Sequence, residues 1–120
     1  MTMISQNFVM WQGEDKTLRI PIVDGDGDPV NLTGSTVRWE MFKPTADPVA
    51  VKTTGDGITL YNAAGTNDGI QIEIDPADTT DVTDGEYSHE CRVTDGAGNK
   101  AVVFVGLVTL YYSETLTVEA

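Results

Sequence analysis

The stretch of sequence that decides the fold runs from Asp84 to Tyr112 and reads DGEYSHECRVTDGAGNKAVVFVGLVTLYY. Its first ten residues alternate, with Tyr87, His89 and Cys91 on one side of an extended chain and polar residues between them, which is typical of a strand with one buried face. Its last thirteen are mostly apolar and β-branched, as in the most buried strands of a sheet, and are too few for a membrane-spanning helix, which needs about 20 residues. Glycine, aspartate and asparagine between the two runs permit a tight reversal. The stretch therefore predicts the core hairpin of an antiparallel sheet.

The remainder of the chain repeats the same short alternating segments between turn signals. Further strands are expected at residues 8–11, 17–23, 37–43, 49–53, 58–61 and 69–74. Pro21 cannot donate to a ladder, so its strand is expected at an edge. The only helical candidate is 75–82, where Asp75 would cap a turn that begins at Pro76. These signals predict an all-β fold, an immunoglobulin-like antiparallel β-sandwich of about seven or eight strands with one short helical turn.

Length and composition indicate one domain with an acidic surface. Residues 1–120 are expected to form a single β-sandwich, with a short N-terminal arm at 1–7 and a polar C-terminal tail at 113–120 that could contact neighbouring proteins. The net charge of −12 opposes binding to nucleic acid or to anionic membranes. Cys91 is the only cysteine, so no intrachain disulfide can form, and no signal peptide is recognisable at the N-terminus. We therefore expect synthesis in a cytoplasm.

Three aspartates form the candidate metal site. Asp24, Asp26 and Asp28 have the spacing of the first ligands of a helix-loop-helix calcium loop. That loop also needs glycine at its sixth position and glutamate at its twelfth, where this chain has Pro29 and Ser35. An acidic hairpin turn is the simpler interpretation, and a calcium site is the alternative.

No set of residues indicates catalysis. His89 and Cys91 lie on one strand face, but a zinc site would need two further ligands of suitable type, and the chain has no other histidine or cysteine. A nucleophilic pair would also need an orienting group and an oxyanion donor that cannot be assigned. The sequence therefore predicts a protein that is not an enzyme and uses no cofactor.

Aromatic residues near strand ends are the candidate partner contacts. Trp11 precedes the first turn, and Tyr111 and Tyr112 end the last strand. Large aromatic side chains with a polar tip are enriched at protein interfaces. With the tail residues Ser113 and Glu114 they make up the expected contact set.

The order of the turn and strand motifs resembles a family of phage proteins. The motifs are WQGED at 11–15, PVNLTGSTV at 29–37, GIQI at 69–72, DGEY at 84–87, DGAG at 95–98 and a final strand that contains Gly106. In this order, over roughly residues 8–112, they are similar to the N-terminal domain of tailed-bacteriophage baseplate upper proteins and related small immunoglobulin-like phage structural proteins.

That resemblance implies a non-enzymatic structural component of a tailed phage virion. Its partners would be other virion proteins of the head (as a capsid decoration), neck or tail and baseplate, on which it would dock in symmetric copies as a homo-oligomer. It would be located in the virion after synthesis in the host bacterial cytoplasm. The alternative is a carbohydrate- or cell-surface-binding adhesion module that uses the aromatic residues and, in a calcium-dependent form, the three aspartates.

Overall fold

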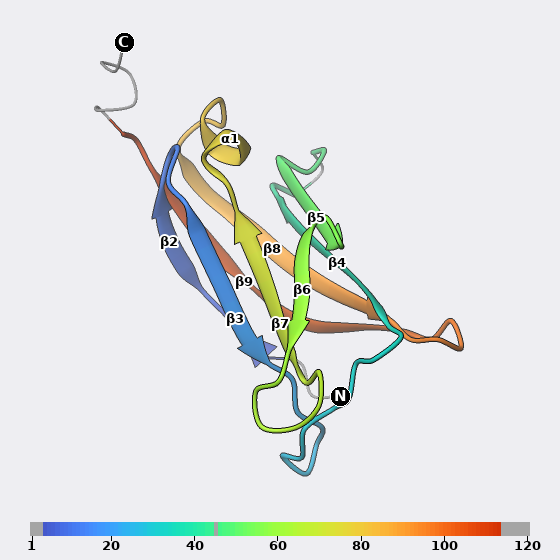
Figure 1. Cartoon of the computed structure of the whole chain (residues 1–120). Helices are drawn as coiled ribbons and strands as arrows, with labels where there is room; N and C mark the ends of the chain where they lie inside the picture. Colours follow the sequence, from blue (N-terminus) through green and yellow to red (C-terminus); the bar gives the residue numbers. More distant parts are fainter. Residues whose placement is uncertain (1–3, 45, 114–120) are drawn as a thin grey trace.

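The computed structural model describes residues 4–44 and 46–113, and these form a β-sandwich with one short helix (Figure 1). The strands are β1 (Ile4–Ser5), β2 (Phe8–Trp11), β3 (Lys16–Pro21), β4 (Thr36–Phe42), β5 (Ala50–Thr54), β6 (Gly57–Tyr61), β7 (Gly69–Ile74), β8 (Gly85–Thr94) and β9 (Lys100–Tyr111), and the helix is α1 (Pro76–Thr79).

The strands are arranged in two facing layers. Hydrogen-bonded neighbours follow the order β1-β9-β8-β4-β5-β6-β7-β3, and β2 also pairs with β9. The link between β5 and β6 is only two residue pairs long, and there the path folds over, so that β6, β7 and β3 lie in front of β9, β8 and β4 (Figure 1). Buried side chains from both layers form one hydrophobic core. The predicted immunoglobulin-like sandwich is confirmed by this arrangement.

Two details of packing are typical of immunoglobulin-like sandwiches. Trp39 on β4 is fully buried and lies opposite Cys91 on β8. The hydroxyl of Tyr87, near the start of β8, donates a 2.6 Å hydrogen bond to the carbonyl oxygen of Thr83, which is the arrangement called a tyrosine corner. The residue two places after that tyrosine, where antibody domains have a cysteine, is His89 in this chain.

The alternation in the sequence correctly identified the inward faces. Val37 and Met41 are buried beside Trp39, and the three isoleucines of β7 are buried as well. Pro21 lies at the end of β3, which among the described strands pairs only with β7 and is therefore an edge strand, as expected. The helix α1 begins at Pro76, after Asp75 as its N-cap, also as expected.

The N-terminal strands differ from the expectation of an antiparallel sheet preceded by an arm at 1–7. Ile4 and Ser5 form β1, and both β1 and β2 run parallel to β9. Part of the expected arm is thus a strand of the domain's own sheet, Gln6 and Asn7 connect it to β2, and residues 1–3 lie outside the described residues. The N-terminal segment is held against the sheet because Gln6, which lies between β1 and β2, approaches His89 and Gly106 closely.

The imidazole of His89 connects this N-terminal segment to the core. Its Nδ1 accepts a 2.9 Å hydrogen bond from the indole N–H of Trp39, so the proton must be on Nε2, which donates to the carbonyl oxygen of Gln6. A side chain at Gly106 would overlap that carbonyl and lie 2.8 Å from Nε2 of the histidine. The backbone at Gln6 can therefore reach the core only because residue 106 has no Cβ.

Candidate interaction surface

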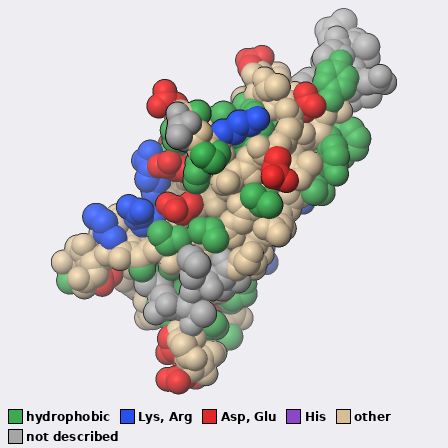
Figure 2. Space-filling view, turned by 180° about the vertical axis from the view of Figure 1, so that it is seen from behind, with side chains coloured by type: hydrophobic (Ala, Val, Ile, Leu, Met, Phe, Trp, Pro, Cys, Tyr) green, Lys and Arg blue, Asp and Glu red, His purple; other side chains and the backbone are tan. Residues whose placement is uncertain are grey.

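The largest exposed apolar side chains gather on the outer face of β2 and β9. We call Val9, Trp11, Leu107 and Tyr111 the β2–β9 patch; each is between 43% and 51% exposed. In Figure 2 hydrophobic side chains follow this edge of the molecule toward its C-terminal end. Exposed apolar side chains that form one group, and are not scattered singly, indicate an interaction site.

The strand register explains why these four side chains meet. Trp11 pairs with Tyr111 across β2 and β9, and their rings lie 5.1 Å apart at an angle of 38°. Val9 lies two residues before Trp11 on the same face, beside Thr109. Leu107 lies two residues before Thr109 on the same face of β9, and its backbone N–H donates a hydrogen bond to the side chain of Asn7. A shallow hollow of about 230 Å³ opens between Val9, Leu107 and Glu86.

The structure brings together most of the contact residues that the sequence predicted. Trp11, Tyr111 and Tyr112 lie at one end of the molecule and are all about half exposed. Ser113 is placed beside them, and its N–H donates a 3.1 Å hydrogen bond to the side chain of Gln12. Glu114 lies outside the described residues. Val9 and Leu107 were missed, although their outward positions follow from the same alternation that identified Trp11.

The three aspartates of the candidate calcium site do lie together. Asp24, Asp26 and Asp28 each offer a carboxylate oxygen within 4.8 Å of the others. However, one oxygen of Asp24 already accepts hydrogen bonds from the backbone N–H groups of Asp26 and Asp28, and these bonds lower the pKa of Asp24. Asp95 makes the same contacts with the N–H groups two and four residues further on, in the β8–β9 turn. The contacts of Asp24 are therefore explained by turn formation alone.

His89 and Cys91 are both buried in the core, and neither lies on a surface. Burial lowers the pKa of His89, with the hydrogen bond to Gln6 acting in the opposite direction, so the imidazole stays neutral near pH 7. Burial also raises the pKa of the Cys91 thiol, which keeps it protonated and unreactive. Cys91 packs in the core, and His89 both packs there and links Trp39 to Gln6 through its two ring nitrogens.

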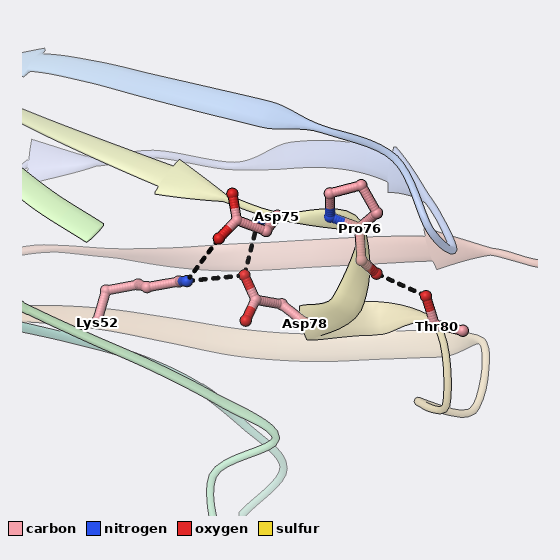
Figure 3. A network of polar contacts seen from close by, with 5 residues as sticks. All are labelled: Lys52, Asp75, Pro76, Asp78 and Thr80. Carbon is pink, nitrogen blue, oxygen red and sulfur yellow. Dashed lines mark hydrogen bonds and ion pairs between the residues drawn. The ribbon is translucent and has the colours of Figure 1, made fainter. Parts of the chain in front are cut away.

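A second polar cluster, centred on Lys52, was not expected from the sequence. Lys52 on β5 points inward, and its ammonium lies 2.9 Å from a carboxylate oxygen of Asp78 and 3.6 Å from one of Asp75 (Figure 3). Burial alone would lower the pKa of Lys52, but the hydrogen bond and charge of Asp78 raise it above the ordinary value. The amine is thus a protonated partner in an ion pair that fastens β5 to α1, and it is not a nucleophile.

Comparisons with known proteins give no assignment of family. No protein-family model matches the chain, and no curated protein matches it. Among solved structures, it is similar to CopC from Methylosinus trichosporium OB3b, with 15% identity over 82% of this chain and 78% of that one and a TM-score of 0.43. It is also similar to a chain in the crystal structure of ICOS in complex with ICOS-L and an anti-ICOS-L VNAR domain, with 12% identity over 91% of this chain and 55% of that one and a TM-score of 0.45. These likenesses carry no argument about function.

Among residues 4–44 and 46–113, no helix has the length and apolar character that crossing a membrane requires.

Proposed function

We propose that this protein is a non-enzymatic structural component of a tailed phage virion, located in the particle after assembly in the bacterial cytoplasm. It docks on other virion proteins of the head, neck or tail and baseplate through the β2–β9 patch, in symmetric copies. The virion assignment is supported by the ordered sequence motifs that resemble baseplate upper proteins. The mode of action is supported by the structure, because the patch is exposed, apolar and built on two paired strands.

The main observation in support of this docking surface is the contact between Trp11 and Tyr111. Large aromatic side chains supply much of the binding energy at interfaces, because they bury a large area at a small cost in conformational entropy. Here both rings are about half exposed and hold each other in place by contact at 5.1 Å. A preformed aromatic pair of this kind loses little freedom when a partner covers it.

Incorporation into particles tests this proposal. A variant with Trp11→Ser and Tyr111→Ser, expressed during infection by the parent phage, should be at least about tenfold depleted from gradient-purified particles, because interface aromatics typically contribute about 2 kcal/mol or more. Tyr61→Ser is the matched control, since Tyr61 is a partly exposed aromatic residue on β6, in the other layer of the sandwich and away from the patch. Absence of the unmodified chain from purified particles would overturn the virion role. Equal incorporation of both variants would overturn the docking surface.

The same aromatic pair favours one alternative, a carbohydrate- or cell-surface-binding adhesion module. Sugar rings stack on exposed aromatic faces, and the tilted Trp11–Tyr111 pair presents such faces beside a shallow hollow. Binding to a glycan array that is lost in the Trp11→Ser variant would favour adhesion over a virion role. A rise in melting temperature on addition of calcium, abolished by Asp24→Asn, would favour its calcium-dependent form.

A further inference from the structure

Four charged side chains lie together on the outer face of β4 and β8, with the two positive ones at one end of the group and the two negative ones at the other. We call Arg38, Glu40, Glu90 and Arg92 the charge quartet. The register places Arg38 directly opposite Arg92 and Glu40 directly opposite Glu90. Within each strand the charges attract, with 2.5 Å between Arg38 and Glu40 and 3.7 Å between Arg92 and Glu90. Figure 2 shows this face, with basic side chains gathered toward the β8–β9 turn and acidic ones beside them.

This arrangement is not the one that would stabilise an isolated sheet best. Like charges directly opposite each other on neighbouring strands are destabilising, whereas opposite charges there contribute roughly 0.2–1 kcal/mol. Exchanging the arginine and glutamate of one strand would convert both repulsive pairs into attractive ones. The quartet instead separates positive charge at one end from negative charge at the other. All four side chains are between 31% and 54% exposed, so a partner can reach them.

We propose that the outer face of the β4–β8 sheet binds a second copy of this chain, face to face, through the charge quartet. A two-fold axis that lies between the two sheets and crosses the strands reverses the strand direction of the partner. Arg38 and Arg92 of one copy then lie over Glu40 and Glu90 of the other, and the reverse contacts follow by symmetry. The quartet is therefore complementary to itself, which is the property that a closed dimer needs.

The side chains beside the quartet are compatible with such a contact. Val51 and Val105 lie next to the two glutamates in the register, and Thr53 and Val102 lie next to the two arginines. These small, partly apolar side chains would meet their counterparts across the two-fold axis. A hollow of about 300 Å³ lined by the four charged residues leaves room for the partner's side chains.

The overall charge decides the conditions for the test. Each copy carries a net charge of −12, so two copies repel each other over long distances. At about 0.15 M salt this long-range repulsion is screened beyond roughly 8 Å, whereas contacts within a packed interface are screened much less. Association is therefore measured on the full chain at this ionic strength.

Charge reversal with rescue tests the inference by sedimentation equilibrium. The unmodified chain should dimerise at concentrations up to about 100 μM. Arg38→Glu with Arg92→Glu makes all four charges negative, and Glu40→Arg with Glu90→Arg makes all four positive. Each double variant alone should dimerise at least about tenfold more weakly. An equimolar mixture of the two should form a heterodimer, and the chain with all four reversals should regain the homodimer.

Each other outcome has a defined meaning, provided that circular dichroism shows every variant to be folded. A monomeric unmodified chain across this concentration range would overturn the inference. Unchanged dimerisation of the double variants would show that another surface is used and would also overturn it. Binding of an acidic peptide at the arginine end with no self-association would overturn it in favour of a different partner. The inference does not depend on the virion role, because it concerns the purified chain alone.

Discussion

Replacement of Gly106 by alanine should destabilise the protein strongly, although alanine is normally well tolerated in place of a glycine with ordinary φ. The φ of Gly106 is not positive, so the backbone itself accepts alanine. The added Cβ would, however, overlap the carbonyl oxygen of Gln6. Because that oxygen belongs to the backbone, the whole segment around Gln6 has to move away from β9.

The hydrogen bonds that this movement would break determine the size of the effect. Gln6 N–H donates a 2.7 Å hydrogen bond to the carbonyl of Val105, and the side chain of Asn7 accepts a 2.9 Å bond from Leu107 N–H. Each contributes about 1 kcal/mol. The Nε2–H of His89, which is 1% exposed, would be left without its acceptor, and an unsatisfied buried donor costs about 1–3 kcal/mol. We expect the free energy of unfolding to fall by about 3–5 kcal/mol.

Urea denaturation followed by tryptophan fluorescence measures this decrease. Gly96→Ala is the matched control, because Gly96 has no positive φ and the nearest atom to its added Cβ is 4.0 Å away; it should change the stability by less than about 0.5 kcal/mol. Deletion of residues 1–7 removes the obstructing carbonyl and leaves only the 2.8 Å approach to Nε2 of His89, so Gly106→Ala should cost much less in that shortened chain than in the full-length one. A full-length Gly106→Ala variant as stable as the control would refute the proposed contact, and so would an equal cost in both backgrounds.

Three further predictions concern side chains of the core and its rim. The free energy of unfolding should fall with a slope approaching 1.4 kcal/mol per pH unit as the pH drops below about 6.5. Burial lowers the pKa of His89 in the folded protein, so in this range only the unfolded chain protonates the imidazole. Urea midpoints measured between pH 7.5 and 5 would show the decrease, and a flat profile would contradict it. Tyr87→Phe should cost about 1 kcal/mol, the value of its 2.6 Å hydrogen bond to Thr83, and calorimetry that finds no loss would argue against the tyrosine corner. Lys52→Met keeps the aliphatic stem but leaves Asp78 without its cation, so it should lower the stability by about 1.5 kcal/mol; a gain measured by urea denaturation would mean that desolvation outweighs the ion pair.

The fold was predictable from the sequence because its signals are local. A period of two places Trp39, Ile72 and Cys91 on inward faces whatever the order of the strands. The turns were equally evident, since an aspartate that accepts hydrogen bonds from the next N–H groups, such as Asp95, needs only its own neighbours. The exposure of Trp11 followed from its position at a strand end.

Features that depend on distant partners were not predictable. The parallel pairing of β1 rests on Gln6 reaching His89, 83 residues away in the sequence. The inward position of Lys52 rests on Asp78, which lies on α1 after two further strands. The charge quartet likewise follows only from the register of β4 against β8, because each strand by itself shows an ordinary alternation of charged and apolar residues.

The charge quartet and the aromatic pair of the β2–β9 patch belong to one sheet but lie at separate places on it. Leu110 pairs with Gly85, so the Trp11–Tyr111 pair lies about seven residues along the sheet from the quartet, or roughly 20 Å. A dimer centred on the quartet would therefore leave one aromatic pair uncovered at each of its two ends. Such a dimer would bind a symmetric particle at two points, and the second contact would form at a high effective concentration.

This geometry separates the roles of the two surfaces in one experiment. The Trp11→Ser and Tyr111→Ser variant should dimerise normally but bind particles weakly, because it lacks the docking residues. The Arg38→Glu and Arg92→Glu variant keeps the patch and should bind particles more weakly than the unmodified chain only because it is monomeric. Full reversal of the quartet should then restore both dimerisation and particle binding. Restored dimerisation without restored particle binding would show that the quartet side chains contact the particle directly, and that the second copy is not what strengthens attachment.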